Sequence, residues 1–171
     1  MSAQKAFELC PEAIFIPPRM SHYKIVSQQI RGIFARYTDL IEPLSLDEAY
    51  LDVTKNKWNL SSATVIAKKI QREVWQETGL TCSAGVSYNK FIAKIASDFR
   101  KPAGMTVITP NDAARFLREL PIEKFYGVGK KTVEKMKLLG IHSGDDLYLF
   151  DQSELLSQFG KHGYILYQRV R

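Results

Sequence analysis

Apolar residues follow two different periods along the first 108 residues. Ile30, Ile33 and Phe34 are spaced three and four apart, which places them on one face of a helix. Ala49 and Leu51 instead alternate with polar neighbours, as residues of a strand do. The pattern predicts helices over residues 3–9, 21–37, 61–78 and 88–99, strands over 13–16, 81–87 and 105–108, and two more strands inside 41–54 that join near 45–47. This alternation favours a sheet layered with helices.

The pattern changes at Thr109-Pro110, a pair typical of a helix N-cap followed by a first-turn proline. The periodic segments after it are all helical: 111–120, 130–139, 144–150, 152–159 and 161–170. We therefore place a domain boundary near residue 108. The 63 residues that follow are few for an independent core, so we expect them to lean on the first part or on a ligand.

Composition narrows the class of protein. Hydrophobic residues make up 45% and charged residues 25%, which is typical of a globular protein and excludes wholesale disorder. No apolar run approaches the roughly 18 residues of a membrane helix, and the first residues do not resemble a signal peptide. Cys10 and Cys82 form neither a disulfide framework nor a metal motif, so we expect a reduced, cytoplasmic setting without membrane contact.

The segment Ser45-Leu46-Asp47-Glu48 places two adjacent carboxylates at the predicted hairpin tip. Neighbouring residues of a regular strand point to opposite faces, so the two acids converge only if the tip departs from strand geometry. Two such carboxylates can bind Mg²⁺ together with substrate phosphates, whereas the alternative is a solvated acidic turn. Asp52 is the nearest third acid, but it lies four residues further along the strand.

A basic amphipathic helix follows, with Lys90 and Lys94 four residues apart and Arg100-Lys101 at its end. Cations are favoured near a helix C-terminus, so Arg100 and Lys101 have a structural explanation. The functional alternative is that Lys101 points at phosphates held near the hairpin.

The turn Gly127-Val128-Gly129 separates a short predicted helix from a second helix that begins near Lys130. Residues 124–137 contain five lysines and one glutamate, a charge of +4, whereas the other 157 residues share only +2 of the total of +6. Glycines allow close backbone approach, and free amides at a helix start attract anions. The pattern predicts a helix-hairpin-helix that binds DNA phosphates; the alternative is an ordinary connection with solvated lysines. Residues 159–163 resemble a weaker second phosphate loop.

Four motifs occur in an order and spacing that resemble the Y-family translesion DNA polymerases: IEPLSLDEAYLDVT (41–54), TCSAGVSYNKFIAKIAS (81–97), KPAG (101–104) and the glycine hairpin. The resemblance implies an α+β fold. Residues 1–19 would be a remnant of the fingers, 20–108 an incomplete ferredoxin-like palm, and 109–171 a small all-α thumb with the helix-hairpin-helix.

The resemblance also implies roles for individual residues. Asp47 and Glu48 correspond to catalytic, metal-binding carboxylates that hold two Mg²⁺ ions in the complete enzyme, and Lys101 corresponds to a lysine that contacts the incoming deoxynucleoside triphosphate. The residues implied to hold the DNA backbone are Gly127, Val128, Gly129, Lys130 and Lys131. The implied partners are primer–template DNA, the triphosphate and, in the full-length protein, a sliding clamp.

The chain also departs from the family pattern. No apolar strand with an acidic pair precedes Ala3, and most of the fingers and the C-terminal domain have no counterpart. We therefore expect a polymerase fragment that is inactive alone and whose exposed strand edges favour self-association. Two other readings stay open: a non-catalytic DNA-binding module, and a nuclease or nucleotide cyclase on a similar sheet.

Overall fold

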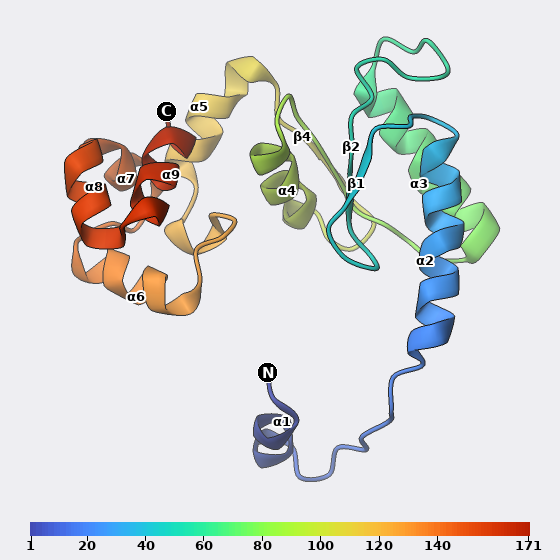
Figure 1. Cartoon of the computed structure of the whole chain (residues 1–171), viewed down its shortest axis with the longest axis horizontal. Coiled ribbons are helices and arrows are strands. Elements are labelled where there is room, and N and C mark those ends of the chain that lie inside the picture. The colour runs from blue at the N-terminus through green and yellow to red at the C-terminus, as the bar shows by residue number, and fades with distance from the viewer.

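The computed structural model describes all 171 residues as a mixed α+β chain, which confirms the predicted fold class (Figure 1). The first part contains α1 (Ala3–Leu9), α2 (Met20–Ala35), β1 (Ile41–Pro43), β2 (Ala49–Leu51), α3 (Ala63–Thr78), β3 (Ala84–Val86), α4 (Lys90–Phe99) and β4 (Met105–Val107). The second part contains α5 (Pro110–Glu119), the 3₁₀ turn η1 (Ile122–Lys124), α6 (Lys130–Leu138), α7 (Gly144–Leu149), α8 (Gln152–Phe159) and α9 (Lys161–Arg169).

The strands form two separate ribbons. Strands β1 and β2 pair antiparallel, with Glu42 opposite Tyr50, whereas β3 and β4 pair in parallel, with Gly85 opposite Thr106. All four strands and the joining of β1 to β2 were predicted, but the pairing of β3 with β4 in a ribbon of their own was not, and each strand is only three residues long. The strand predicted over 13–16 is wrong, because this extended segment has no neighbouring strand to pair with and lies between prolines.

Most helix ends have the local chemistry that the sequence predicts. The Ser62 side chain accepts a hydrogen bond from the Val65 amide, and α3 ends at Gly79 in the left-handed conformation. Helix α4 begins where the Asn89 side chain accepts from the Ile92 amide. Thr109 precedes α5 as predicted, although its hydroxyl donates to Asp112 Oδ2 (2.7 Å) and caps no amide.

Two hydrophobic cores hold the chain together. The smaller core joins α2 to α3 and consists of Ile33, Tyr37, Ile66, Ile70 and Val74. The larger one contains 15 buried residues: Ile92, Ile95 and Ala96 of α4, Ile108 directly after β4, and 11 residues of the helical second part. The second part therefore packs against α4, as expected from its small size. The predicted boundary near residue 108 passes through this core.

The molecule is open in shape. Its accessible surface is 11386 Å², whereas a compact protein of 19.5 kDa exposes about 8,500 Å². Helix α1 buries no residue, and it lies apart from the rest of the chain at the end of an extended segment in which Ile14 is 88% exposed (Figure 1). Self-association through the strand edges stays a prediction. None of the helices has the length and apolar character needed to cross a bilayer.

Helix α4 lies directly against β3 because Gly85 has no side chain. A Cβ atom on Gly85 would lie 1.9 Å from the Ala93 carbonyl oxygen and 2.5 Å from the Ser97 nitrogen, both backbone atoms of α4. By contrast, Gly32 lies inside α2 with nothing within 4 Å of such an atom.

We therefore expect Gly85→Ala and Gly32→Ala to have opposite effects. Gly85→Ala should lower the free energy of unfolding by about 3 kcal/mol or more, because helix and strand must separate. Gly32→Ala should raise it by about 0.5–1 kcal/mol, because alanine is the better helix former. Urea unfolding followed by circular dichroism measures both, and equal small effects would contradict the close packing of α4 on β3.

A hydrogen bond and two ion pairs link the smaller core to the residues at its surface. The buried Tyr37 donates its hydroxyl hydrogen bond to Glu73, and Arg36 pairs with Glu73 (3.2 Å) and with Glu77. Burial of Tyr37, its hydrogen bond to Glu73 and the charge of that carboxylate raise the pKa of the phenol to about 12.

We expect Tyr37→Phe to lower the free energy of unfolding by about 1–2 kcal/mol at pH 8. The raised pKa means that the folded state keeps the phenolic proton more tightly than the unfolded chain, whose tyrosines ionise near pH 10. The stability that Tyr37 contributes is therefore complete below pH 10 and disappears as the pH rises toward 12. Denaturant titrations at several pH values should show the difference between the two proteins shrinking across this interval; a constant difference would contradict the assignment.

Candidate functional site

The acidic tip of the β1–β2 ribbon is held in place by α2. Arg31 Nη2 donates to the Ser45 carbonyl oxygen (2.9 Å), and the Ser27 hydroxyl donates to the Leu46 carbonyl oxygen. Both donors belong to the tip-facing side of α2, and Ser27 is buried. The tip therefore has a fixed position relative to the smaller core.

Inside the tip, Ser45 organises the two acids. Its hydroxyl donates to Asp47 Oδ1 (2.6 Å) and accepts from the amides of Asp47 (3.3 Å) and Glu48 (3.1 Å). The Glu48 carbonyl closes the turn by accepting from the amides of Leu44 and Ser45. Both acids precede β2, so they are outside regular strand geometry, which is the condition under which adjacent carboxylates can converge.

Asp47 and Glu48 line one cleft of about 520 Å³ between the two ribbons. Lys94 and Lys101 line the same cleft, so the structure brings the predicted carboxylates and the predicted phosphate-binding lysine together. Asp52 does not line it; its Oδ1 accepts from the Thr54 amide (2.9 Å) instead. The expectation that Asp52 lies too far along the strand agrees with this placement.

Lys94 brings a positive charge to Glu48. Its ammonium donates to Glu48 Oε1 (3.0 Å), and the side chain is only 13% exposed. Burial alone would lower the pKa of Lys94, but the hydrogen bond to Glu48 and the charges of Asp98 and Glu48 outweigh burial and raise it. The lysine is thus held charged within a partly buried site.

Lys101 has its own partner. Its ammonium lies 2.6 Å from Asp98 Oδ1, and the other oxygen of Asp98 lies 3.8 Å from Lys94. Burial tends to raise the pKa of Asp98, but the hydrogen bond from Lys101 and the charges of Lys94, Lys101 and Lys124 lower it overall. Asp98 therefore stays ionised between two cations.

The donor chemistry of the tip fits a hard divalent cation. Asp47 and Glu48 offer carboxylate oxygens, the ligands that such cations prefer. The ammonium of Lys94 already stands beside Glu48, which shows that this carboxylate faces a place suited to positive charge. Asp47 and Glu48 are the two carboxylates that line the cleft, and no group of three or more acidic, histidine or cysteine side chains forms a metal cluster.

The glycine hairpin lies in the helical part. The predicted short helix before it is a single 3₁₀ turn, η1, because Pro121 and the extended backbone at Phe125 confine it to three residues. Gly127 has φ = +90°, and Arg169 Nη1 donates to the carbonyl oxygen of Tyr126 beside it (3.1 Å). The backbone of Gly127 and Gly129 is accessible to a ligand, since no side chain of their own covers it.

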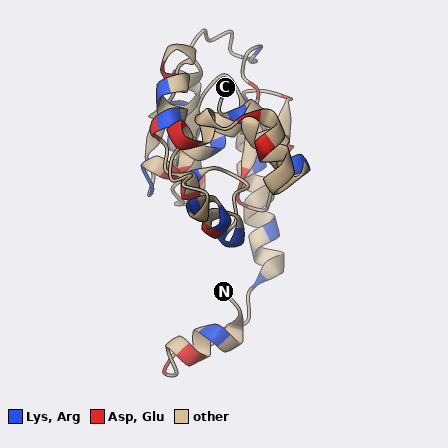
Figure 2. Cartoon of the chain, turned by 90° about the vertical axis from the view of Figure 1, so that its left-hand side faces the viewer, with Lys and Arg blue, Asp and Glu red and all other residues tan.

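Helix α6 has Gly129 as its N-cap, so no side chain caps its first amides, and its first turn contains no acidic residue. Lys130 and Lys131 are exposed there, although lysines are unfavourable at the positive end of a helix dipole. By contrast, α7 and α8 begin with complete capping boxes. A cluster of Lys and Arg marks the lower end of the helical part in Figure 2. This combination suits an anion bound at the hairpin.

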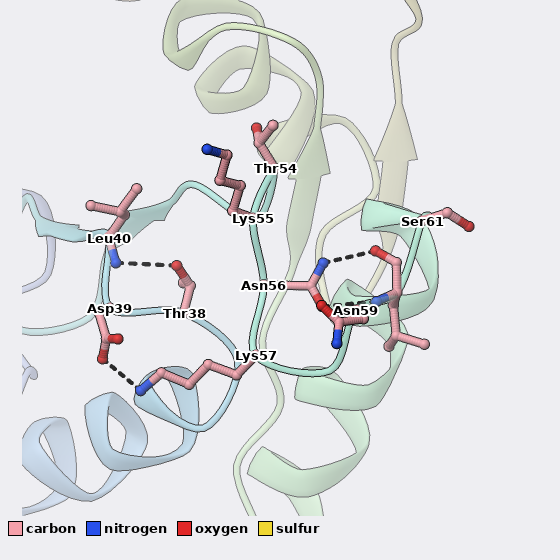
Figure 3. A pocket seen from close by; sticks show the side chains of 10 residues that line it. Thr38, Asp39, Leu40, Thr54, Lys55, Asn56, Lys57, Asn59 and Ser61 are labelled. Carbon is pink, nitrogen blue, oxygen red and sulfur yellow. Dashed lines mark hydrogen bonds and ion pairs between the residues drawn. The ribbon is translucent and has the colours of Figure 1, made fainter.

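A second cavity of about 590 Å³ lies away from these groups (Figure 3). Thr38, Asp39, Thr54–Lys57 and Ser61 are among its lining residues, and none of them lines the acidic cleft. Asn56 shapes it by donating to the carbonyl oxygens of Val53 and Leu60, and Lys57 pairs with Asp39. We assign it no chemistry.

Sequence reasoning missed several groups that the fold adds to the two sites. The sequence pattern identified Lys94 only as one of two lysines on a helix face. The neighbouring Ile95, which is buried, could have indicated that Lys94 is partly buried. The sequence pattern does not single out Asp98, which lies four residues after Lys94 and three before Lys101, on the same face. Arg169 is far from the hairpin in sequence and gives no signal.

Family models match both parts of the chain. The model of the impB/mucB/samB family matches residues 1–98, more than half of the chain, and the IMS family HHH motif matches residues 110–141. The chain belongs to the impB/mucB/samB family. The resemblance to Y-family polymerases that the motifs carry is thereby confirmed.

Relatives and solved structures of the impB/mucB/samB family agree with this membership. DNA polymerase IV of Listeria monocytogenes is 60% identical over 171 residues, which are all of this chain and 48% of that protein. DNA polymerase IV of Streptococcus pyogenes is 57% identical over the same length and 47% of that protein. The chain thus spans about half the length of the curated relatives it matches.

Two solved structures match nearly the whole fold. DinB from Sulfolobus solfataricus superimposes with a TM-score of 0.88 at 34% identity, over 98% of this chain and 50% of that one. An insertion ternary complex of Dbh DNA polymerase gives a TM-score of 0.86 at 35% identity, over 100% of this chain and 51% of that one.

Proposed function

We propose that this chain forms the palm and thumb part of a template-directed DNA polymerase that copies past lesions. The carrying observation is the shared cleft, in which Asp47 and Glu48 lie with Lys101 between the ribbons. In this proposal residues 20–108 act as palm, 109–171 as thumb and 1–19 belong to the fingers. Primer–template DNA and a deoxynucleoside triphosphate are the substrates, as the ternary complex of a structural relative suggests.

The reaction is nucleotidyl transfer. The primer 3′-hydroxyl oxygen forms a bond to the α-phosphorus of the triphosphate, the bond from that phosphorus to the bridging oxygen breaks, and pyrophosphate leaves. Asp47 and Glu48 would hold divalent cations, for which we propose Mg²⁺, and these ions would lower the pKa of the hydroxyl and neutralise the phosphates when bound. Lys101 would bind the phosphates directly, since its ammonium is exposed in the cleft and shared only with Asp98.

The glycine hairpin would position the duplex. Gly127, Val128 and Gly129 bring accessible backbone to a phosphate, and Lys130 and Lys131 add positive charge at the helix start. Such interactions fix the position of DNA and read no sequence, which suits an enzyme that copies any template.

A segment exchange tests the catalytic proposal. We expect that the DNA polymerase IV of L. monocytogenes still extends primers when its matching segment is replaced by this chain. Glu48→Gln in that chimera should lower the extension rate at least about a hundredfold, because a metal ligand is removed. A single-turnover primer-extension assay measures both rates.

Glu42→Gln is the matched control, since Glu42 lies on the same ribbon but pairs with Lys90 outside the cleft. It should leave the rate within about twofold. The 171-residue chain alone should extend no primer, because it brings only two carboxylates together. Unchanged extension by the Glu48→Gln chimera would refute the catalytic role and favour a DNA-binding module.

The hairpin has a separate test on the 171-residue chain. Replacing Lys130 and Lys131 by alanine should weaken binding to duplex DNA and reduce the slope of log K against log salt concentration by about 2, one for each lysine that no longer neutralises a phosphate. Fluorescence anisotropy with two unrelated sequences should show the same weakening for both. Lys55→Ala with Lys68→Ala removes the same charge far from the hairpin and should leave the slope nearly unchanged; equal slopes for both pairs would contradict the assignment.

A further inference from the structure

Four side chains form a row of alternating charge, three of which (Glu48, Lys94 and Lys101) line the cleft, while the fourth, Asp98, joins the two lysines. Glu48 Oε1 lies 3.0 Å from Lys94 Nζ, Lys94 Nζ lies 3.8 Å from Asp98 Oδ2, and Asp98 Oδ1 lies 2.6 Å from Lys101 Nζ. Three of them come from one face of α4 and its end, and Glu48 comes from the hairpin tip. The row therefore runs from a proposed metal ligand to the proposed triphosphate-binding lysine.

Lys94 is the member that can change partners. Its ammonium bonds Glu48, but Asp98 lies at the edge of ion-pair distance, and the Tyr126 ring lies 5.7 Å away. Both alternative partners stabilise a cation. If a divalent ion takes Glu48, a small movement of the ammonium brings it to Asp98 without exposing an unpaired charge.

Lys90 provides the contrast on the same helix, one turn earlier. It pairs with Glu42 and lies 5.7 Å from the Tyr50 ring, but the pair is more than half exposed and Glu42 does not line the cleft. Helical spacing alone therefore does not produce the arrangement around Lys94.

We propose that Lys94 and Asp98 are positioning residues that act as an exchange relay for the metal site. Lys94 neutralises Glu48 until a divalent cation binds there, and Asp98 then accepts the displaced ammonium. In doing so Asp98 weakens its hold on Lys101, whose ammonium becomes available to phosphate. This inference rests on the proposed function, since it assumes that Glu48 is a metal ligand.

The test is Mn²⁺ binding to the 171-residue chain, followed by electron paramagnetic resonance. Lys94→Met should bind about tenfold more tightly, because a competing cation is removed while the side-chain length is kept. Asp98→Asn should bind about threefold more weakly, because the displaced ammonium no longer has an acceptor. The double variant should match Lys94→Met alone, and Lys90→Met should stay within about twofold of the original chain.

The double variant separates the relay from simple electrostatics. If Asp98 acts only as a nearby negative charge, Asp98→Asn weakens Mn²⁺ binding equally with and without Lys94, and that additive result overturns the relay. Unchanged or weaker binding by Lys94→Met also overturns it. Lys94→Gln repeats the measurement with a polar neutral side chain, and thermal unfolding confirms that each variant is folded.

Removal of both acids distinguishes failure of the relay from failure of the proposed function. Asp47→Asn with Glu48→Gln should abolish the Mn²⁺ signal. If the Mn²⁺ signal is lost in this variant while the effects of Lys94→Met and Asp98→Asn are additive, the metal site is correct and the relay is wrong. If the signal does not depend on Asp47 and Glu48, the proposed metal site is wrong, and the relay fails with it.

Discussion

The close approach of α4 to the backbone at Gly85 is the constraint on which the rest of the structure depends. With no Cβ in the way, the helix lies against the β3–β4 ribbon at a distance that any other residue would prevent. One face of α4 then enters the larger core through Ile92, Ile95 and Ala96, while the opposite side presents Lys94 to the cleft and places Asp98 behind it as an ion-pair partner. Helix α4 thereby positions Lys94 and Asp98 and also packs against the helical second part.

The two sites handle charge in opposite ways. In the cleft Lys94 and Lys101 both have acidic partners. The pairing of Lys94 offsets the cost of a charge that is largely withdrawn from water, whereas Lys101 is paired although its side chain is more than half exposed. At the hairpin, Lys130 and Lys131 lie at the unfavourable end of α6 with no acid in the first turn. Under the proposed function, pairing would keep the cleft ordered until ligands displace the partners, whereas the unpaired lysines of the hairpin would attract phosphate from a distance.

Local signals predicted the elements well because they act within a few residues. Ser62, Asn89 and Gly79 mark helix ends through hydrogen bonds with neighbouring backbone, and the predicted helices over 61–78 and 88–99 begin and end within two residues of the observed ones. The strand expected at 13–16 failed because pairing needs a distant partner, which an apolar run does not reveal. The two acids at 47 and 48 could be named, but their shared cleft depends on Ser27 and Arg31 of α2, which hold the tip.

The same reasoning explains why the links between the sites escaped prediction. Phe91 of α4 packs on Phe125 (ring centroids 6.0 Å apart) and under the guanidinium of Arg169, which also bonds the Tyr126 carbonyl oxygen. Lys94, one turn along α4, faces the Tyr126 ring. Each of these interactions joins residues more than 30 positions apart, so no periodicity encodes it. Because α4 contacts both the hairpin and Glu48, the proposed phosphate site at Gly127 lies at a set distance from the acidic cleft. Displacement of the hairpin would have to break the cation–π interaction of Lys94 with Tyr126 and the hydrogen bond from Arg169 to the Tyr126 carbonyl oxygen together.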